Sequence, residues 1–228
     1  MNMKKWPYLS LWLNAMCAGI ILSCAGAASV YASAGFENAS LSSLIQALVF
    51  PVGLLIICIC KFKLYTGCCG TCLCDNNGVG DYFGKLGIAW IANFFGAFTA
   101  TCVLFMIGAD RFEDKIILIA QSKMDMDFIG LVLLGVACNF LICLGIIMAE
   151  KLTCDFSAAL ILFLVVFLFV ICKFEHSVAN MFYLLYGWLA SPDIKFFEIF
   201  YNLIPVSIGN LFGGVFAALV VGYNTKDS

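Results

Sequence analysis

The sequence predicts an all-α polytopic membrane protein with six transmembrane passages, the second and fifth of which are broken. Composition supports this, because 64% of the 228 residues are hydrophobic and only 11% are charged. Soluble globular proteins have about 25% charged residues, and disordered chains are poor in apolar ones. The formal net charge of −2 provides no basic excess to neutralise phosphates, which excludes nucleic acid as an expected partner. The expected surroundings are a lipid bilayer.

The passages themselves follow from the stretches between charged residues, because a spanning helix needs about 20 apolar residues. Long charge-free stretches cover residues 8–35, 38–60, 86–109, 128–149 and 199–223. The fifth passage is 156–172, which continues as 177–190 after the charged cluster 173–176, and the second is interrupted at 61–63. An even number of passages places both termini on one side. A weak excess of basic residues on that side predicts cytoplasmic termini in a multi-pass protein of the cell inner (plasma) membrane.

Two motifs recur in the two halves of the chain. Ile59-Cys60-Lys61-Phe62 returns 112 residues later at 171–174, and Asn93-Phe94-Phe95-Gly96-Ala97 returns 117 residues later at 210–214. Each half then holds three passages, an odd number, so the halves have opposite orientations. We expect a single transmembrane channel domain over 1–228, with half-repeats at about 8–109 and 128–223. Inverted repeats with broken helices are typical of transporters and channels.

The two interruptions are the expected functional centre. A charge in the membrane centre costs at least ~2.5 kcal/mol on insertion scales, and unwound backbone there needs protein or water as a partner. Both costs fall at the same two places, so the breaks should face each other and line a path. The alternative is that Lys61, Lys63 and Lys173 extend their charged ends to the membrane surface.

His176, the only histidine, lies in the second break beside Glu175. A neutral imidazole both donates and accepts a hydrogen bond, so His176 suits a polar centre, although a histidine satisfied within the core is the alternative. Thr66 follows the first break at roughly the equivalent place, and its hydroxyl can contact a small anion. Its alternative is a hydrogen bond back to its own helix.

The thirteen cysteines resemble a disulfide scaffold only at first sight. Those inside apolar runs should pack as small, reduced hydrophobes: Cys17, Cys24, Cys58, Cys60, Cys102, Cys138, Cys143 and Cys172. Cys69-Gly70-Thr71-Cys72 is a Cys-x-x-Cys motif, which leaves a membrane thiol oxidoreductase as an alternative. No second pair exists to relay electrons, so we expect a protein that is not an enzyme, with no cofactor and no metal.

The motifs resemble those of the formate–nitrite transporters along essentially the whole chain. The matching segments are 174–182 around His176, 202–214 in the last passage, Leu64-Tyr65-Thr66, 93–97 and Cys138-Asn139. The resemblance implies an aquaporin-like protomer, a homopentamer and one pore per protomer for small monovalent anions. It places His176, Thr66 and Asn139 at the polar centre of the pore.

The same resemblance implies two apolar constrictions and a group of anion-attracting lysines. Leu54 and Leu64, with Phe50 one turn further out, would form one constriction, and Phe169 and Ile142 the other. Lys123 resembles the lysine that attracts anions into the outer vestibule. Lys61, Lys63 and Lys173 depart from the family pattern, which usually has small residues or an acid there, and they make both breaks more positive.

These departures, together with the cysteine usage, favour the hydrosulfide-channel branch, ahead of formate and nitrite. Apolar constrictions strip an anion of water, and a weak acid avoids this by crossing as the neutral molecule. Each unit of pKa below ambient pH adds about 1.4 kcal/mol to that route, and hydrogen sulfide has the pKa closest to neutrality. A water–glycerol type channel shares the inverted repeat but normally carries two Asn-Pro-Ala motifs, which this sequence lacks.

Overall fold

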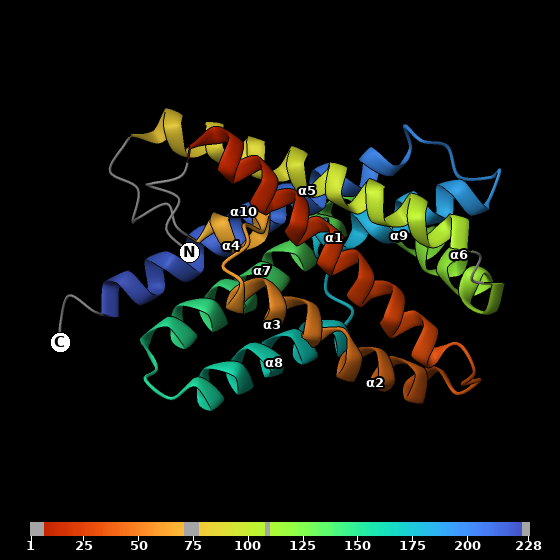
Figure 1. The fold of residues 1–228 in the computed structure, drawn as a ribbon, viewed down its shortest axis with the longest axis horizontal. Helices are drawn as coiled ribbons and strands as arrows, with labels where there is room; N and C mark the ends of the chain where they lie inside the picture. Colours follow the sequence, from red (N-terminus) through yellow and green to blue (C-terminus); the bar gives the residue numbers. More distant parts are fainter. Residues whose placement is uncertain (1–6, 71–77, 108–109, 225–228) are drawn as a thin grey trace.

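The computed structural model describes residues 7–70, 78–107 and 110–224, and in these ranges the regular elements are α-helices (Figure 1). In chain order they are α1 (Tyr8–Ser33), α2 (Ala39–Val49), α3 (Pro51–Ile59), α4 (Tyr65–Cys69), α5 (Val79–Ile107), α6 (Asp110–Met124), α7 (Phe128–Lys151), α8 (Asp155–Ile171), α9 (Ser177–Ala190) and α10 (Ile199–Asn224).

The six predicted passages are α1, α2–α4, α5, α7, α8–α9 and α10. Within the described ranges, five stretches are long and apolar enough to cross a membrane, namely α1, residues 39–59, α5, α7 and most of α10. The remaining passage is divided between α8, with 17 residues, and α9, with 14 residues, neither of which spans a bilayer alone. The all-α polytopic fold with broken second and fifth passages is therefore confirmed.

The second passage contains a joint at Phe50, between α2 and α3, that was not predicted from the sequence. Residues 38–60 were expected to form one helix, and residues 39–59 do form one spanning stretch. Within it α2 ends at Val49 and α3 starts at Pro51, while Phe50 between them keeps helical angles, with φ −56° and ψ −35°. Proline lacks the backbone N–H that continues a helix and is tolerated at a first helical position. The passage therefore restarts at Pro51, and Phe50 lies at the joint between α2 and α3.

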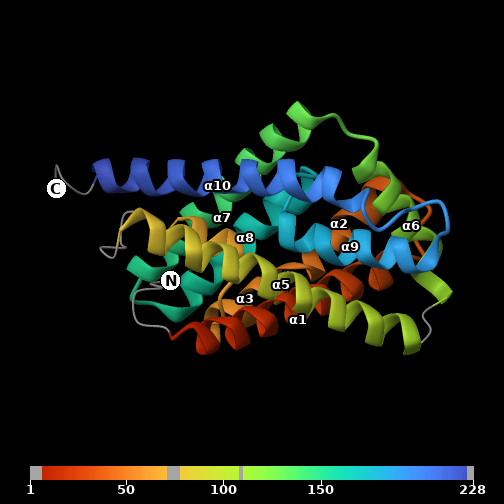
Figure 2. The same cartoon turned by 90° about the horizontal axis from the view of Figure 1, so that it is seen from above.

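The charged connection between the third and fourth passages forms α6, a helix that was also not predicted. Ile116 and Ala120 lie one turn apart and are fully buried, and the position that a Cβ on Gly187 of α9 would take lies 2.6 Å from Ala120 Cβ. The segment holds no charge-free stretch because its other face carries charged residues. The helix closes one end of the bundle beside α9 (Figure 2).

The inverted repeat is visible in how the long helices pair. α1 packs against α5, and α7 packs against α10. A Cβ on Gly96 would lie 2.1 Å from the Met16 carbonyl oxygen, and one on Gly213 would lie 2.3 Å from that of Val136. Gly96 and Gly213 are 117 residues apart, so the same motif brings two backbones into contact in each half.

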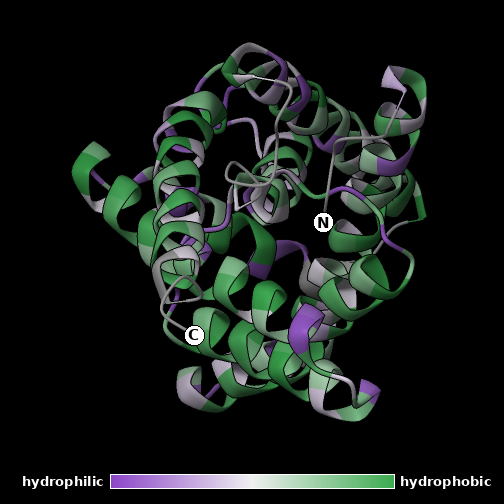
Figure 3. Ribbon diagram, turned by 90° about the vertical axis from the view of Figure 1, so that its left-hand side faces the viewer, coloured by the Kyte–Doolittle hydropathy of each residue, from purple (hydrophilic) through white to green (hydrophobic). Residues whose placement is uncertain are grey.

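The described chain starts and ends at the same end of the bundle. α1 begins and α10 finishes on the left in both Figure 1 and Figure 2, as an even number of passages requires. Seen from that end, the helices are mostly hydrophobic (Figure 3). Many large apolar side chains are exposed, such as Leu133 at 63% and Phe212 at 61%. This surface suits lipid or neighbouring protomers and is unsuited to water.

Candidate functional site

Both breaks begin with the same backbone turn. Lys61 follows α3 with a φ of 58°, and Lys173 follows α8 with a φ of 55°. This left-handed conformation usually ends a helix at glycine, because a side chain makes it costly. The hydrogen bonds that close the two turns also match, and each is 2.9 Å long: Phe62 N–H to the Ile57 carbonyl, and Phe174 N–H to the Phe169 carbonyl.

Asn93 of α5 fixes the chain after the first turn. Its Oδ1 accepts the N–H of Tyr65, the first residue of α4, at 2.8 Å. Its Nδ2 donates to the Lys63 carbonyl at 3.0 Å and to the Ala15 carbonyl of α1 at 2.7 Å. Asn93 is fully buried, so these bonds satisfy unwound backbone that has no access to water.

Asn210 of α10 performs the same task in the second break. Its Oδ1 accepts the N–H of Ser177, the first residue of α9, at 2.8 Å. Its Nδ2 donates to the carbonyls of Glu175 at 3.0 Å and of Gly135 at 2.9 Å. The two asparagines are the residues whose recurrence indicated the repeat. Both breaks are thus held by an asparagine from a neighbouring long helix.

His176 and Thr66 meet where the two breaks face each other, as the sequence analysis expected. Thr66 Oγ1 lies 3.0 Å from His176 Nε2, and the two residues are 0% and 3% exposed. Asn139 of α7 donates to the Thr66 carbonyl at 3.0 Å, and the Cys143 thiol donates to it at 3.3 Å. The three polar residues predicted from the sequence therefore lie together.

The proton on the His176 ring is placed by its neighbours. Nδ1 accepts the N–H of Ala179 at 3.1 Å and so caps the start of α9. A nitrogen that accepts carries no proton, so the neutral ring has its proton on Nε2. Nε2 then donates to Thr66 Oγ1, and the Thr66 hydroxyl keeps its own hydrogen to donate elsewhere.

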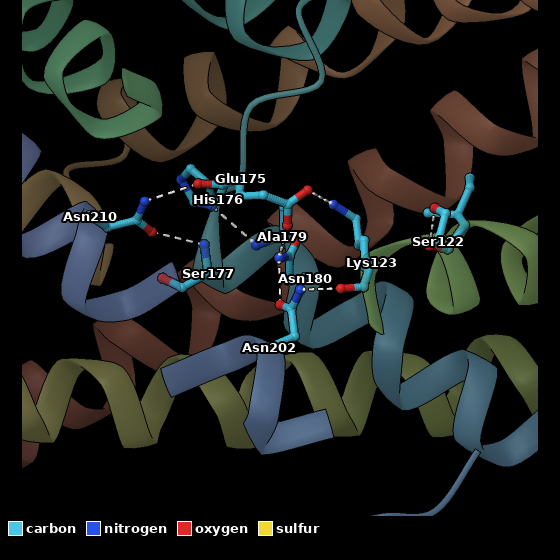
Figure 4. A network of polar contacts seen from close by, with 10 residues as sticks. Ser122, Lys123, Glu175, His176, Ser177, Ala179, Asn180, Asn202 and Asn210 are labelled. Carbon is cyan, nitrogen blue, oxygen red and sulfur yellow. Dashed lines mark hydrogen bonds and ion pairs between the residues drawn. The ribbon is translucent and has the colours of Figure 1, made fainter. Parts of the chain in front are cut away.

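Beside His176, four residues form a closed ring of polar contacts that includes the main-chain carbonyl of Lys123 (Figure 4). Lys123 pairs with Glu175 at 2.7 Å, and Asn180 donates to Glu175 at 2.5 Å and to Asn202 Oδ1 at 2.8 Å. Asn202 returns to the Lys123 carbonyl at 2.9 Å. The charge of Lys123 is thus matched by a carboxylate only 2% exposed. Asn180 and Asn202 were not singled out from the sequence, although both lie in quoted motifs.

The five predicted apolar constriction residues are all buried, each at 4% exposure or less: Leu54, Leu64, Phe50, Phe169 and Ile142. Phe169 stacks on the His176 ring, with centroids 5.6 Å apart. Phe50 meets Phe169 edge-on at 5.9 Å. Phe50 was expected further out on the Leu54 and Leu64 side. The joint before Pro51 instead places it with Phe169, beside the histidine.

Two cavities open on either side of this region. One, of about 900 Å³, is lined by Lys61, Lys63 and Glu150 among others. The second, of about 420 Å³, reaches His176 and is lined by Lys123 and Lys173. The lysines of the breaks thus line cavities. This holds both for lysines that face a path through the bundle and for lysines that extend their charged ends to the membrane surface. Leu54, Leu64 and Ile142 belong to neither lining.

A family model described as Formate/nitrite transporter matches residues 1–224. The chain belongs to the formate/nitrite transporter family. An uncharacterized transporter of Bacillus subtilis, YrhG, is 30% identical over 207 residues, which are 84% of this chain and 76% of that protein. The formate channel FocA of Escherichia coli is 27% identical over 96% of this chain and 85% of its own length. A formate-nitrite transporter of Entamoeba histolytica is 28% identical, and the match spans 62% of that protein.

Solved structures of this family have the same fold. An FNT family ion channel superposes with a TM-score of 0.87 at 24% identity, covering 95% of this chain and 90% of that one. A pentameric formate channel with formate bound superposes with a TM-score of 0.88 at 22% identity, covering both chains fully. The aquaporin-like, six-passage architecture expected from the resemblance is confirmed by these matches.

The cysteine motif of this formate/nitrite transporter is only partly described. Cys72 lies outside the described residues, so the alternative that rests on a Cys69–Cys72 pair is not tested. Cys69 is fully buried in α4 and donates to the Tyr65 carbonyl at 3.2 Å. Among the described residues, histidine, cysteine and acidic side chains form no group that would hold a metal ion.

Proposed function

We propose that this family member is a channel for small monovalent anions of weak acids, with His176 and Thr66 as its central polar pair. The observation that carries the proposal is the 3.0 Å contact between Thr66 Oγ1 and His176 Nε2. It joins the two breaks between apolar side chains and lies beside a cavity that opens outward. Asn139 supports the pair through the Thr66 carbonyl.

The hydrogen-bond donors of His176 and Thr66 suit an anionic solute. Because His176 donates through Nε2, Thr66 directs its remaining hydroxyl hydrogen at a passing solute. Hydrogen bonds that involve a charged group contribute about 1.5–3 kcal/mol, which offsets part of the cost of removing water from the anion. His176 keeps the hydroxyl oriented, and the bond from Ala179 keeps His176 in the required tautomer.

The apolar residues around the centre favour solutes that can shed their charge. Phe50 and Phe169 on one side, and Leu54, Leu64 and Ile142 in the wall, offer no polar atom from their side chains to replace water. A bare ion is expensive in such surroundings. A weak acid takes a proton and crosses as a neutral molecule, at about 1.4 kcal/mol for each unit by which its pKa lies below ambient pH.

Hydrosulfide is the preferred substrate in this proposal, because the pKa of hydrogen sulfide is near neutrality. The extra lysines also support it: Lys61 and Lys63 line one cavity, together with Glu150 and Asp155, and Lys173 lines the other, so the lysines add positive charge to both mouths. Formate is the second candidate, favoured by the names of relatives such as FocA, and nitrite is the third. A thiol oxidoreductase finds no support in the family membership or in the buried position of Cys69.

The proposal extends to the oligomeric state of the protein and to its orientation in the membrane. A homopentamer with one pore per protomer is supported by the pentameric neighbour of the same fold and by the exposed apolar faces. We place the protein in the plasma membrane with both termini in the cytoplasm. The larger cavity, which lies between α3, α7 and α8, then faces the cytoplasm, and the cavity beside His176 faces outward.

The test is the influx of sulfide, formate and nitrite into proteoliposomes at several pH values, with protein-free liposomes as the control for leakage. We expect all three rates to exceed the control, with sulfide fastest near neutral pH and formate gaining as the pH falls. If formate influx is faster than sulfide influx at every pH, formate is the preferred substrate and the choice of hydrosulfide is wrong. Rates equal to the control for all three anions would contradict the channel function itself.

A further inference from the structure

Lys115 of α6 is a cation on the cavity that leads to His176, and the mechanism above does not use it. The cavity is lined by Lys115 together with Ser42, Lys123 and Lys173. The Lys115 ammonium donates to the Ser33 carbonyl at 2.5 Å and to the Ser42 hydroxyl oxygen. These contacts tie α6 to the end of α1 and the first turns of α2, at the mouth of the cavity.

The surroundings of Lys115 differ from those of Lys123. Lys123 is matched by Glu175, whereas both recorded partners of Lys115 are neutral oxygens. Within the described part of the chain, Lys115 takes part in no ion pair. Burial lowers the pKa of Lys115, and no carboxylate acts against this effect. Among the described residues, Lys115 is therefore a cation without an ion-pair partner, whereas Lys123 is paired with Glu175.

The geometry leaves donors for a ligand. An ammonium has three N–H groups, and two of them reach Ser33 and Ser42. Ser42 uses its oxygen to accept from Lys115, so its hydroxyl hydrogen remains to be donated. Further polar side chains line the same cavity: Ser43, Gln46 and Ser122. The same lining holds two carboxylates, Glu37 and Glu175, of which Glu175 is paired with Lys123. Around Lys115 the lining thus combines a cation outside any recorded ion pair with hydroxyl and amide donors, which is the chemistry that recognises a small anion.

We propose that Lys115 and Ser42 form the site that collects anions at the outer mouth of the pore, in place of the lysine at position 123. The proposal rests on the channel function proposed above and names its recruiting residue. Lys115 raises the local anion concentration, and Lys115 and Ser42 each donate one hydrogen bond. From there the anion moves past Lys173 toward Phe169 and His176.

The test is the concentration dependence of formate influx into proteoliposomes for wild type, Lys115→Met and Lys115→Arg. Lys195→Met is the matched control, because Lys195 is 77% exposed and lines neither cavity. We expect Lys115→Met to raise the half-saturating concentration about three- to tenfold, with an unchanged maximal rate and a weaker dependence on ionic strength. Lys115→Arg and Lys195→Met should stay close to wild type.

A purely structural role of Lys115 gives a different result. In that case Lys115→Met lowers the maximal rate and the thermal midpoint but leaves the half-saturating concentration unchanged, and the proposal is overturned. If Lys115→Met does not fold, Lys115→Gln keeps a donor toward Ser33 without the charge and carries the same expectation. Failure of wild type to conduct formate or sulfide would instead remove the proposed function and this inference with it.

Discussion

His176 links the two breaks, because one ring nitrogen caps α9 after the second break and the other contacts Thr66 after the first. Protonation of Nδ1 would remove the acceptor for the Ala179 N–H and leave that donor buried without a partner, at a cost of about 1–3 kcal/mol. The fold therefore stabilises the neutral ring with its proton on Nε2. Thr66 is the group that this arrangement presents to a solute.

The Thr66 hydroxyl can be tested without changing the shape of the site. Thr66→Val keeps the branched side chain and removes the oxygen, so His176 Nε2 loses its partner and the anion loses a donor. We expect formate and sulfide influx to fall by about 10- to 100-fold, the equivalent of a charged hydrogen bond. Thr66→Ser is the matched control and should retain most of the flux. A rate for Thr66→Val equal to wild type would remove Thr66 from the mechanism.

Single residues were predictable from the sequence where chemistry made them conspicuous. His176 is the sole histidine in an apolar chain, and Thr66 follows a motif that recurs, so both were found. The pairing of Lys123 with Glu175 was not, because 52 residues separate them and only the packing of α6 against α9 brings them together. Phe50 was misplaced because its direction depends on the joint at Pro51.

At the scale of elements, the positions of the breaks were predictable and their internal geometry was not. Charge interrupting an apolar run located both ends to within one residue, because the predicted stretches end at Cys60 and Cys172 and the helices end at Ile59 and Ile171. The left-handed turns at Lys61 and Lys173 were hidden, since glycine is the usual signal for such a turn. Helix α6 was not predicted because an amphipathic helix shows itself by its 3.6-residue period, whereas a spanning helix shows itself by an absence of charge.

The lysines in these turns carry a conformational cost that glycine would remove. We expect Lys173→Gly to raise the free energy of unfolding by about 0.5–1 kcal/mol, measured as an increased thermal midpoint in detergent. Lys173→Ala, which loses the charge but keeps the Cβ, is the matched control and should not gain stability. A midpoint for Lys173→Gly below that of wild type would show that the lysine side chain itself stabilises the break.

The close helix pairs give a second prediction about elements. A Cβ at Gly96 would lie 2.1 Å from the Met16 carbonyl oxygen, so Gly96→Ala must separate α1 from α5. We expect a loss of roughly 1–3 kcal/mol or more, together with displacement of Asn93, which braces the first break. Gly84→Ala in the same helix has no atom within 4 Å of the new Cβ. It should be neutral or slightly stabilising in a thermal melt, and equal melting of both variants would contradict the packing described.

In the whole molecule, two units of three passages each pack around the central polar pair His176 and Thr66. Each half supplies a broken helix, an asparagine brace and a close helix pair, and the offsets of 112 and 117 residues seen in the sequence reappear as matching hydrogen bonds. The inverted architecture was therefore predictable from short motifs alone. The cavities were not, because their shape depends on α6 and on the joint at Phe50.

The exposed apolar faces lead to a prediction about assembly. A homopentamer covers part of these faces and leaves the rest to lipid, while each protomer keeps its own pore. Native mass spectrometry of the detergent-solubilised protein should give the mass of five chains of 24.9 kDa. A stable monomer that still conducts anions would contradict the homopentamer but would agree with one pore in each protomer.

The most direct test of the central claim compares formate influx through wild type and His176→Asn in matched proteoliposomes. Asparagine retains a side-chain oxygen that caps α9, but it has no group in the place of Nε2 to orient Thr66. The account predicts a variant with nearly unchanged thermal stability and strongly reduced influx. A folded His176→Asn protein that conducts formate as fast as wild type would contradict a pore centred on His176 and Thr66.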